Sequence, residues 1–276
     1  MSTLIVGCGY LGLHVARQLH EIQPNSPIYG TTRSPDRFEK IEAAGAKPVL
    51  CDVLDPTSLA SLPETADIVH CVSMGRKQGE SLTGMAQFLA EFARRKWTGR
   101  LIHVSTTSVY GQTDGSWVTE ESPAEPASEA GRVALDLESL VRAGFPQQTS
   151  TIRMVGLYGP GRIIQKSAIE QGEAIGGDPD RWLNLIHISD AARAVVAALR
   201  TTQAWPLVLA CDDRPITRAT YYETLAELIG APAPRWKPLN EGPVEPNKRV
   251  SNRKMREELG CEPRYHTIFE GLKTAL

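Results

Sequence analysis

The sequence predicts an α/β fold: a doubly wound parallel sheet with a small, mostly helical C-terminal lobe. Three observations predict it. Strand-like apolar runs alternate with helical patterns over residues 1–155. A glycine-rich turn connects the first of these runs to the first helical pattern. Beyond residue 156, glycines, prolines and short helical patterns replace the regular alternation.

The alternation of the first 155 residues defines the expected sheet. Strands separated by helices form right-handed βαβ units, which build a parallel sheet with helices on both faces. The expected strands are Leu4–Val6, Ile28–Thr31, Pro48–Cys51, Ile68–Cys71, Leu101–Val104 and Thr151–Val155, and the expected helices are 11–22, 35–44, 81–96 and 129–143.

The glycine-rich turn reads Gly7-Cys8-Gly9-Tyr10-Leu11-Gly12 and directly follows an apolar run. Between a strand and a helix, this G-x-G-x-x-G spacing is typical of a Rossmann dinucleotide site. Gly7 would make the tight turn, Gly9 would let the backbone approach a pyrophosphate, and Gly12 would let the helix pack closely. The N–H groups of the first helical turn would hold the phosphates.

The remaining residues predict a lobe beside the sheet. We expect residues 1–155 to form the dinucleotide-binding domain, with 183–212 returning to it, and residues 156–182 and 213–276 to form a small substrate-binding lobe. The expected elements are helices near 163–172, 189–200 (capped by Ser189), 217–229 (capped by Thr217), 251–259 and 266–275, a strand at Leu207–Ala210, and a proline-rich loop at 231–246.

Composition excludes several functional classes. A net charge of −2 argues against nucleic acid or an anionic membrane as the main partner. No apolar run approaches the roughly 20 residues of a membrane helix, and we expect no signal peptide before the first strand. The five cysteines are scattered and the six histidines show no metal-ligand spacing. We therefore expect a cytoplasmic protein with reduced cysteines and no metal.

The end of the second strand selects the cofactor. An acid there binds the ribose 2′-hydroxyl of NAD, whereas an arginine accommodates the 2′-phosphate of NADP. The chain has Thr32-Arg33-Ser34 and no acid, which predicts NADP over NAD, unless Arg33 only solvates a helix start. Asp52-Val53 follows the third strand. The Asp52 carboxylate could bind the adenine amino group of the cofactor, or it could cap the next helix.

Three further segments resemble the extended short-chain dehydrogenases/reductases, and with the glycine turn they span nearly the whole chain. Ile102–Gly111 resembles the Ser-Ser/Thr-x-x-Val-Tyr-Gly segment of that superfamily, Arg153–Gly161 its Arg-x-x-x-x-Tyr-Gly-Pro-Gly segment, and Asn184–Ala192 its Ile-His-Val-x-Asp helix entry. The resemblance also implies that Val72 and Ser73, after the fourth strand, touch the cofactor.

The resemblance implies candidate catalytic residues. In that superfamily the Ser or Thr four positions before the Val-Tyr-Gly tyrosine polarises the substrate oxygen, and that position is Thr106 here. Local backbone bonding is the alternative for this hydroxyl. Tyr110 is the nearest other acid, although the superfamily uses it structurally. His103 is expected in the core, and His187 as a cap or in a buried hydrogen bond.

Other residues are candidates for substrate contact. Tyr158 could line the cleft or pack in the interior. Arg153, Lys248 and Arg249 would form a basic mouth suited to an anionic substrate or the cofactor phosphates. For the last two, solvated surface charge is the alternative.

The usual proton-transfer pair of the superfamily is missing. Its Tyr-x-x-x-Lys would align with Ala130 and Ala134, since Gly131 and Glu138 fit the surrounding pattern without a gap. Neither tyrosine nor lysine occurs between residues 111 and 157. Sugar dehydratases of the superfamily place Asp-Glu after the threonine, whereas Thr107-Ser108 follows here.

The overall pattern resembles the small YeeZ-like group of atypical short-chain dehydrogenases, and segments 247–252 and 255–260 also resemble that group. We expect an NADP-preferring oxidoreductase or epimerase-like protein with a non-standard acid, acting on a small carbonyl, alcohol or sugar nucleotide. The alternative is a non-catalytic dinucleotide sensor or scaffold. A homodimer through helices 81–96 and 129–143 is expected, unless the face with Phe88, Leu89 and Phe92 meets the sheet.

Overall fold

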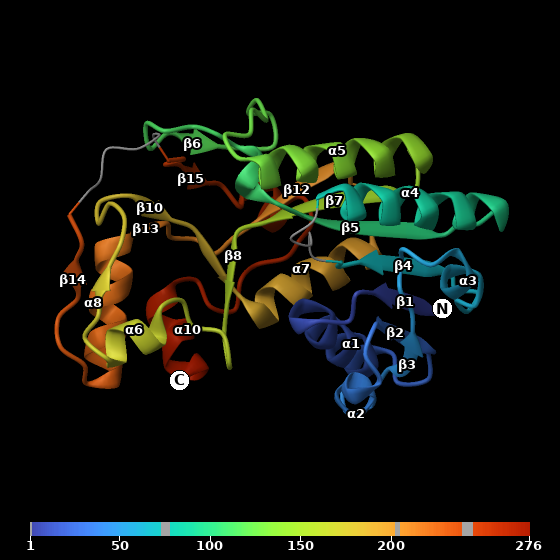
Figure 1. Ribbon diagram of the computed structural model, residues 1–276, viewed down its shortest axis with the longest axis horizontal. Helices are drawn as coiled ribbons and strands as arrows, with labels where there is room; N and C mark the ends of the chain where they lie inside the picture. Colours follow the sequence, from blue (N-terminus) through green and yellow to red (C-terminus); the bar gives the residue numbers. More distant parts are fainter. Residues whose placement is uncertain (1, 73–77, 202–204, 239–244) are drawn as a thin grey trace.

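A seven-stranded parallel sheet forms the centre of the computed structural model, which describes residues 2–72, 78–201, 205–238 and 245–276 (Figure 1). The strand order is β12-β7-β5-β4-β1-β2-β3, so the chain starts in the middle and winds outward in both directions. This confirms the predicted doubly wound fold. The strands are β1 (Thr3–Val6), β2 (Ile28–Thr32), β3 (Lys47–Leu50), β4 (Asp67–His70), β5 (Arg100–Thr106), β7 (Thr149–Met154) and β12 (Leu207–Ala210).

Helices cover both faces of the sheet (Figure 1). One face carries α1 (Tyr10–Ile22) and α7 (Ile188–Arg200), and the other carries α4 (Gln78–Arg94) and α5 (Glu129–Gly144). Because strand side chains alternate between faces, Ile5 packs with α1 and α7, whereas its neighbours Leu4 and Val6 pack with α4 and α5. Smaller elements are η1 (Pro35–Arg37), α2 (Phe38–Glu42) and α3 (Pro56–Ala60).

The lobe has its own apolar cluster, which includes Tyr158, Ile169, Tyr221, Leu225 and Leu272. Helices α6 (Lys166–Glu170), α8 (Arg218–Ile229) and α10 (Ile268–Ala275) belong to this cluster, whereas α9 (Arg253–Glu257) packs with the central sheet through Met255. Short strands pair as β6 (Trp117–Val118) with β15 (Arg249–Val250), β8 (Gly156–Tyr158) with β11 (Leu185–His187), β9 (Ala174–Ile175) with β14 (Arg235–Trp236), and β10 (Trp182–Leu183) with β13 (Ile216–Thr217).

Some predicted elements change in the structure. The helix expected at 35–44 divides into η1 and α2, and the one near 163–172 shortens to α6. The loop expected at 231–246 contains β14, because β14 pairs with β9, which lies 61 residues earlier in the chain. Among helices of the described ranges, none combines the length and apolar character needed to cross a membrane.

The apolar face of α4 does not form a dimer interface. Phe88, Leu89 and Phe92 are all buried within the chain, in one cluster with side chains of β1, β4 and α5. This face therefore packs against the sheet, which was the alternative to a dimer interface. A homodimer through helices 81–96 and 129–143 stays a prediction.

Two buried histidines lie beside each other on the central strands. His70 and His103 are register partners on β4 and β5, with ring centroids 5.5 Å apart. Both side chains are buried, and neither Nδ1 atom has a hydrogen-bond partner among the described residues. Burial lowers the pKa of His70 to about 3 and that of His103 to about 4. Both imidazoles are therefore neutral near pH 7, and His103 belongs to the core as predicted.

This pair predicts a loss of stability in acid. In the unfolded chain an imidazole takes up a proton near pH 6.5, whereas the folded chain keeps both neutral down to about pH 4. Stability is thus highest above pH 6.5 and falls below it, by about 1.4 kcal/mol per pH unit for each imidazole. Urea unfolding of His103→Gln between pH 7 and pH 5 should show a shallower loss than wild type. The exposed control His20→Gln should keep the wild-type slope, and an unchanged slope in His103→Gln would contradict the prediction.

Candidate functional site

The glycine turn between β1 and α1 has the geometry that each of its glycines was expected to provide. Gly7 adopts a φ of +82°, and a Cβ there would lie 2.9 Å from the Val72 backbone. A Cβ on Gly12 would lie 3.1 Å from the Ile5 side chain, so glycine lets α1 pack against β1. At Gly9 the nearest atom would be 3.9 Å away. The surface over Gly9 is therefore open to a ligand.

The start of α1 suits an anion. Its N-cap, Gly9, provides no side chain to cap the helix, and the first turn contains no acid. The turn is anchored to β2, because Cys8 N donates to Thr31 O and Gly7 N donates to Thr31 Oγ1, both at 2.8 Å. Burial raises the pKa of the Cys8 thiol to about 12, so this side chain packs and adds no charge. Uncapped N–H groups at a helix start are a fitting site for a pyrophosphate.

The end of β2 presents Arg33 to solvent. Thr32 is buried, and its hydroxyl accepts from Ser34 N at 3.2 Å and donates to Ser34 O at 3.3 Å. The Ser34 hydroxyl binds Asp36. Both predicted hydroxyl donors are therefore engaged within the turn. Arg33 is exposed, so it is the residue of this segment that can meet a 2′-phosphate.

The carboxylate of Asp52 follows β3. Its Oδ1 accepts from Leu54 N at 3.0 Å, whereas the N-cap of α3 is Asp55, which accepts from Thr57 N at 2.9 Å. The capping alternative for Asp52 is therefore wrong, because the helix begins three residues later than that alternative required. Contact with adenine stays a prediction.

Two apolar residues adjoin the same edge of the sheet. The Val53 side chain faces α4, where it would lie 2.8 Å from a Cβ on Gly84. The backbone of Val72 closes over Gly7. The predicted cofactor residue Ser73 lies outside the described residues.

Thr106 ends β5 and begins a short 3-10 turn, η2 (Thr107–Val109). Its Oγ1 accepts from Ser108 N at 3.1 Å and lies 3.0 Å from Ser108 Oγ. The hydroxyl thus makes the local backbone contact that was the alternative to catalysis. Thr106 is only half-buried, and an accepting hydroxyl keeps its proton for a second partner. Polarisation of a substrate oxygen stays a prediction.

The two alanines at the positions of the missing pair differ in environment. Ala130 is exposed near the start of α5, whereas Ala134 is buried in the core. The intervening Gly131 lets the helix approach η2, because a Cβ there would lie 2.4 Å from Ser108 O. The backbone frame around Thr106 is therefore closely packed, although neither alanine can transfer a proton.

Arg153 forms a buried ion pair. Its Nη2 lies 2.7 Å from Glu138 Oε2, and its Nε donates to Oε1 at 2.9 Å. Ser105 Oγ donates to the same carboxylate at 2.5 Å. Arg153 Nη1 donates to Tyr110 Oη at 2.7 Å, and that hydroxyl donates to Thr119 O at 3.0 Å. Three elements, β5, β7 and α5, meet in this network.

Two predicted roles are therefore wrong. Arg153 is only 4% exposed and its charge is neutralised by Glu138, so it does not form a basic mouth for substrate. Tyr110 is fully buried, its hydroxyl is engaged on both sides, and burial raises the pKa of the phenol. It is a structural residue and cannot serve as the acid. The sequence offered Glu138 only as a motif match and offered no sign of its partners.

Tyr158 and His187 also pack in the interior. Tyr158 is fully buried, with its ring edge-on to His187 at 5.3 Å, so it does not line an open cleft. Burial raises the pKa of its phenol. His187 Nδ1 accepts from Ser189 N at 3.3 Å and caps α7. The cap predicted at Ser189 is thus wrong, because the helix begins one residue before it.

Lys248 reaches the site from the C-terminal segment. Its Nζ donates to Tyr110 O at 2.8 Å, just beyond η2. Its backbone oxygen accepts from the Asn184 side chain at 2.9 Å, and Asn184 O accepts from Gly156 N beyond the end of β7. No carboxylate pairs with Lys248 among the described residues. Burial, with a smaller contribution from Arg181, lowers the pKa of this amine to about 8.

Arg249 stabilises the neighbouring loop. Its Nε donates to Gly115 O at 2.8 Å, and its guanidinium lies 5.2 Å from the Trp117 ring and 5.1 Å from the Trp182 ring. It is therefore held between two indoles. Of the predicted basic mouth, Lys248 is the member placed at the carboxyl ends of β5 and β7. No spacing rule marked Asn184, which fixes this segment.

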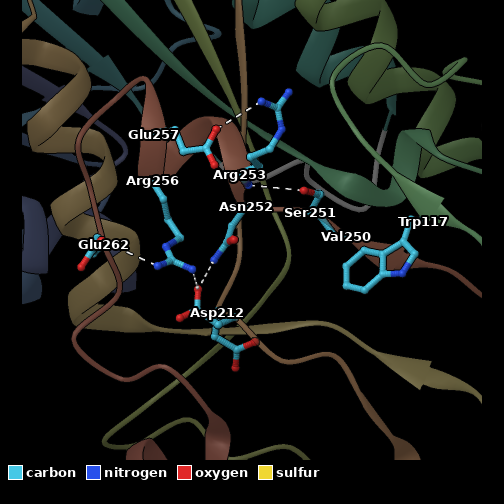
Figure 2. Close-up of a pocket in the computed structure, with 10 residues that line it drawn as sticks. Trp117, Asp212, Val250, Ser251, Asn252, Arg253, Arg256, Glu257 and Glu262 are labelled. Atoms are coloured by element: carbon cyan, nitrogen blue, oxygen red, sulfur yellow. Dashed lines mark hydrogen bonds and ion pairs between the residues drawn. The ribbon is translucent and has the colours of Figure 1, made fainter.

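A cavity of about 350 Å³ lies beyond the carboxyl end of β12, next to β15 and α9 (Figure 2). Most of its charged side chains pair with one another, whereas Asp212 Oδ2 is buried without a hydrogen-bond partner among the described residues. Arg253 lies 3.2 Å from Glu257, and Arg256 lies 3.4 Å from Asp213 and 3.6 Å from Glu262. The pair of Arg256 with Asp213 joins α9 to the segment after β12, whereas the pair of Arg253 with Glu257 lies within α9. The cavity is apart from the glycine turn, and we assign the cofactor site to the turn.

The buried ion pair predicts a large effect on stability. Arg153→Met should lower the free energy of unfolding by about 3–5 kcal/mol, because it leaves the Glu138 carboxylate buried without a counter-charge. The double variant Arg153→Met/Glu138→Leu should recover most of that loss. Urea unfolding at pH 7 measures both, with the exposed Arg94→Ala as a control expected to change stability far less. A double variant as unstable as the single one would refute this account.

The Lys248 amine should titrate near pH 8. Competitive acetylation across pH 6.5–10, followed by peptide mass spectrometry, should give it a lower midpoint than that of a lysine in an unstructured peptide. Arg181→Gln should raise the Lys248 midpoint, since it removes a neighbouring positive charge. A Lys248 midpoint equal to that of the unstructured peptide would show that Lys248 is freely solvated.

Comparisons with known proteins agree with this geometry. Residues 3–210 match the model of the NAD dependent epimerase/dehydratase family. The chain is 27% identical over 273 residues to Protein YeeZ of Escherichia coli K12, with 95% of each chain covered. The solved structure of a functionally unknown conserved protein from Silicibacter pomeroyi is 28% identical, with a TM-score of 0.81 over 99% of this chain and 96% of that one.

The fold likeness extends to more distant enzymes. UDP-glucuronic acid 4-epimerase from Bacillus cereus, solved with UDP-glucuronic acid and NAD, is 21% identical, with a TM-score of 0.84 over 100% of this chain and 98% of that one. The predicted resemblance to the extended short-chain dehydrogenases and to the YeeZ-like group is confirmed. The chain belongs to the NAD-dependent epimerase/dehydratase family.

Proposed function

We propose that this protein is an NADP(H)-binding oxidoreductase or epimerase of the cytoplasm that acts on a small carbonyl, alcohol or sugar nucleotide. The observation that carries the proposal is the open glycine turn: Gly9 leaves room above an uncapped helix start, where a Cβ would fill the space a pyrophosphate needs. The preference for NADP rests on Arg33, which is exposed at the end of β2.

Each part of the site would then have one role. The N–H groups of α1 would hold the pyrophosphate, Arg33 the 2′-phosphate and Asp52 the adenine amino group. A bound nicotinamide cofactor supplies hydride chemistry. Thr106 would donate a hydrogen bond to the substrate oxygen.

An anionic or phosphorylated substrate suits the charge of the site. Lys248 lies at the carboxyl ends of β5 and β7 without a carboxylate partner among the described residues. A half-buried ammonium group without a carboxylate partner is stabilised by a nearby anion. The Bacillus cereus relative was solved with UDP-glucuronic acid, an anionic sugar nucleotide, which supports the same substrate class.

A second candidate is a dinucleotide sensor or scaffold. The observation that favours it is the pair of alanines, Ala130 and Ala134, at the positions of the usual tyrosine and lysine. Neither side chain can transfer a proton, and Ala134 is also buried in the core. Fluorescence titration with NADPH and NADH, followed by turnover assays on a panel of carbonyls, alcohols and sugar nucleotides, separates the two. Tight NADPH binding without turnover would support the sensor, and binding of neither cofactor would refute both.

The cofactor preference can be tested at one residue. Arg33→Met should weaken NADPH binding at least about tenfold, because hydrogen bonds between charged groups contribute about 1.5–3 kcal/mol. NADH affinity should change less than about twofold, since NADH has no 2′-phosphate. Isothermal titration calorimetry measures both, with the exposed Arg17→Met on α1 as a matched control. An equal loss for both cofactors, or none, would overturn the assignment of NADP.

A further inference from the structure

A tight turn from the lobe side lies against the glycine turn. It comprises residues 159–162, where Arg162 N donates to Gly159 O at 2.9 Å and Gly159 N donates to Arg162 O at 3.1 Å. Pro160 and Gly161 occupy its centre, and Gly161 has a φ of +75°. Proline followed by a left-handed glycine is typical of a type II turn, whose backbone is well defined. The position of Arg162 is therefore fixed by its own backbone.

This turn contacts Tyr10, which is the first residue of α1 and the fourth residue of the G-x-G-x-x-G segment. The Tyr10 hydroxyl donates to Pro160 O at 3.1 Å. The guanidinium carbon of Arg162 lies 5.7 Å from the Tyr10 ring centroid, within the range of a cation–π contact. A Cβ on Gly159 would lie 2.9 Å from the Tyr10 hydroxyl, so the two segments are in close contact. Arg162 is thus held next to the start of α1.

Charge at this point is otherwise sparse. Residues 7–13 contain no charged side chain, and a helix start supplies only about half a positive charge. A dinucleotide pyrophosphate carries two negative charges. Arg162 is exposed and has no ion-pair partner among the described residues, so its guanidinium keeps its donors free.

We propose that Arg162 is a cofactor-binding residue that clamps the pyrophosphate from the lobe side. The guanidinium would donate hydrogen bonds to the non-bridging oxygens opposite the N–H groups of α1, a geometry that arginine matches better than lysine. This inference rests on the proposed function, in that the chain must bind a dinucleotide. It adds a phosphate contact outside the glycine turn, supplied by a segment about 150 residues later in the chain.

The test is the affinity for two cofactors in one variant. Arg162→Met keeps the length and apolar contact of the side chain but removes its charge. It should weaken NADPH and NADH binding equally, by about tenfold or more, because both contain the pyrophosphate. Arg33→Met should weaken NADPH alone. Isothermal titration calorimetry at fixed ionic strength measures all four affinities.

The control is Arg214→Met. Arg214 is likewise exposed, and its guanidinium lies 5.4 Å from the Phe269 ring, within the lobe. It should leave both affinities unchanged, and Arg162→Lys should recover part of the loss. Circular dichroism checks that each variant is folded. If Arg162→Met is not folded, Arg162→Gln replaces it.

The outcomes separate the two proposals. If wild type binds NADPH but Arg162→Met keeps both affinities within about twofold, or loses NADPH alone, the clamp is refuted while the proposed function stands. If wild type binds neither cofactor, the proposed function itself fails. An equal loss for both cofactors, with Arg214→Met unchanged, supports the clamp.

Discussion

The buried pair of Arg153 and Glu138 is the constraint on which the site depends. A charge inside a core is tolerated only with a partner, so β7 and α5 must approach each other wherever these two residues lie. Ser105, the register partner of Arg153, completes the carboxylate's bonds and fixes the end of β5. Thr106 follows immediately. The position of the Thr106 hydroxyl is therefore set by the buried ion pair of Arg153 and Glu138.

The same constraint explains how the site frame persists without the usual proton-transfer pair. Glu138 lies two turns beyond Ala130 on α5, and Gly131 lets the helix contact η2. Together they hold α5 against the carboxyl end of β5. The frame thus requires nothing of the exposed position 130, and of position 134 it requires only a side chain that fits the core. Lys248, from the C-terminal segment, brings an ammonium group to the carboxyl edge of the sheet. A proton donor other than the usual tyrosine is therefore available at this edge.

Sequence patterns predicted those parts of the structure that depend on residues close together in the chain. The glycine turn, the main strands and the Thr217 cap follow from spacing within a dozen residues, and the structure has them. Long-range partners could not be read in this way. No sequence pattern around Arg153 predicts its ion pair with Glu138, and no pattern around residue 235 predicts a strand partner at residue 174. The site roles that were wrong, at Arg153 and Tyr110, and the cleft alternative for Tyr158 are those decided by such distant contacts.

Arg249 between Trp117 and Trp182 has a consequence for how this protein can be observed. A cation beside an indole alters the field around an excited chromophore, so emission of these two tryptophans depends on where the C-terminal segment sits. That segment also carries Lys248 to the sheet edge. The molecule therefore contains its own optical reporter: a ligand that shifts residues 247–250 changes the fluorescence without any label attached.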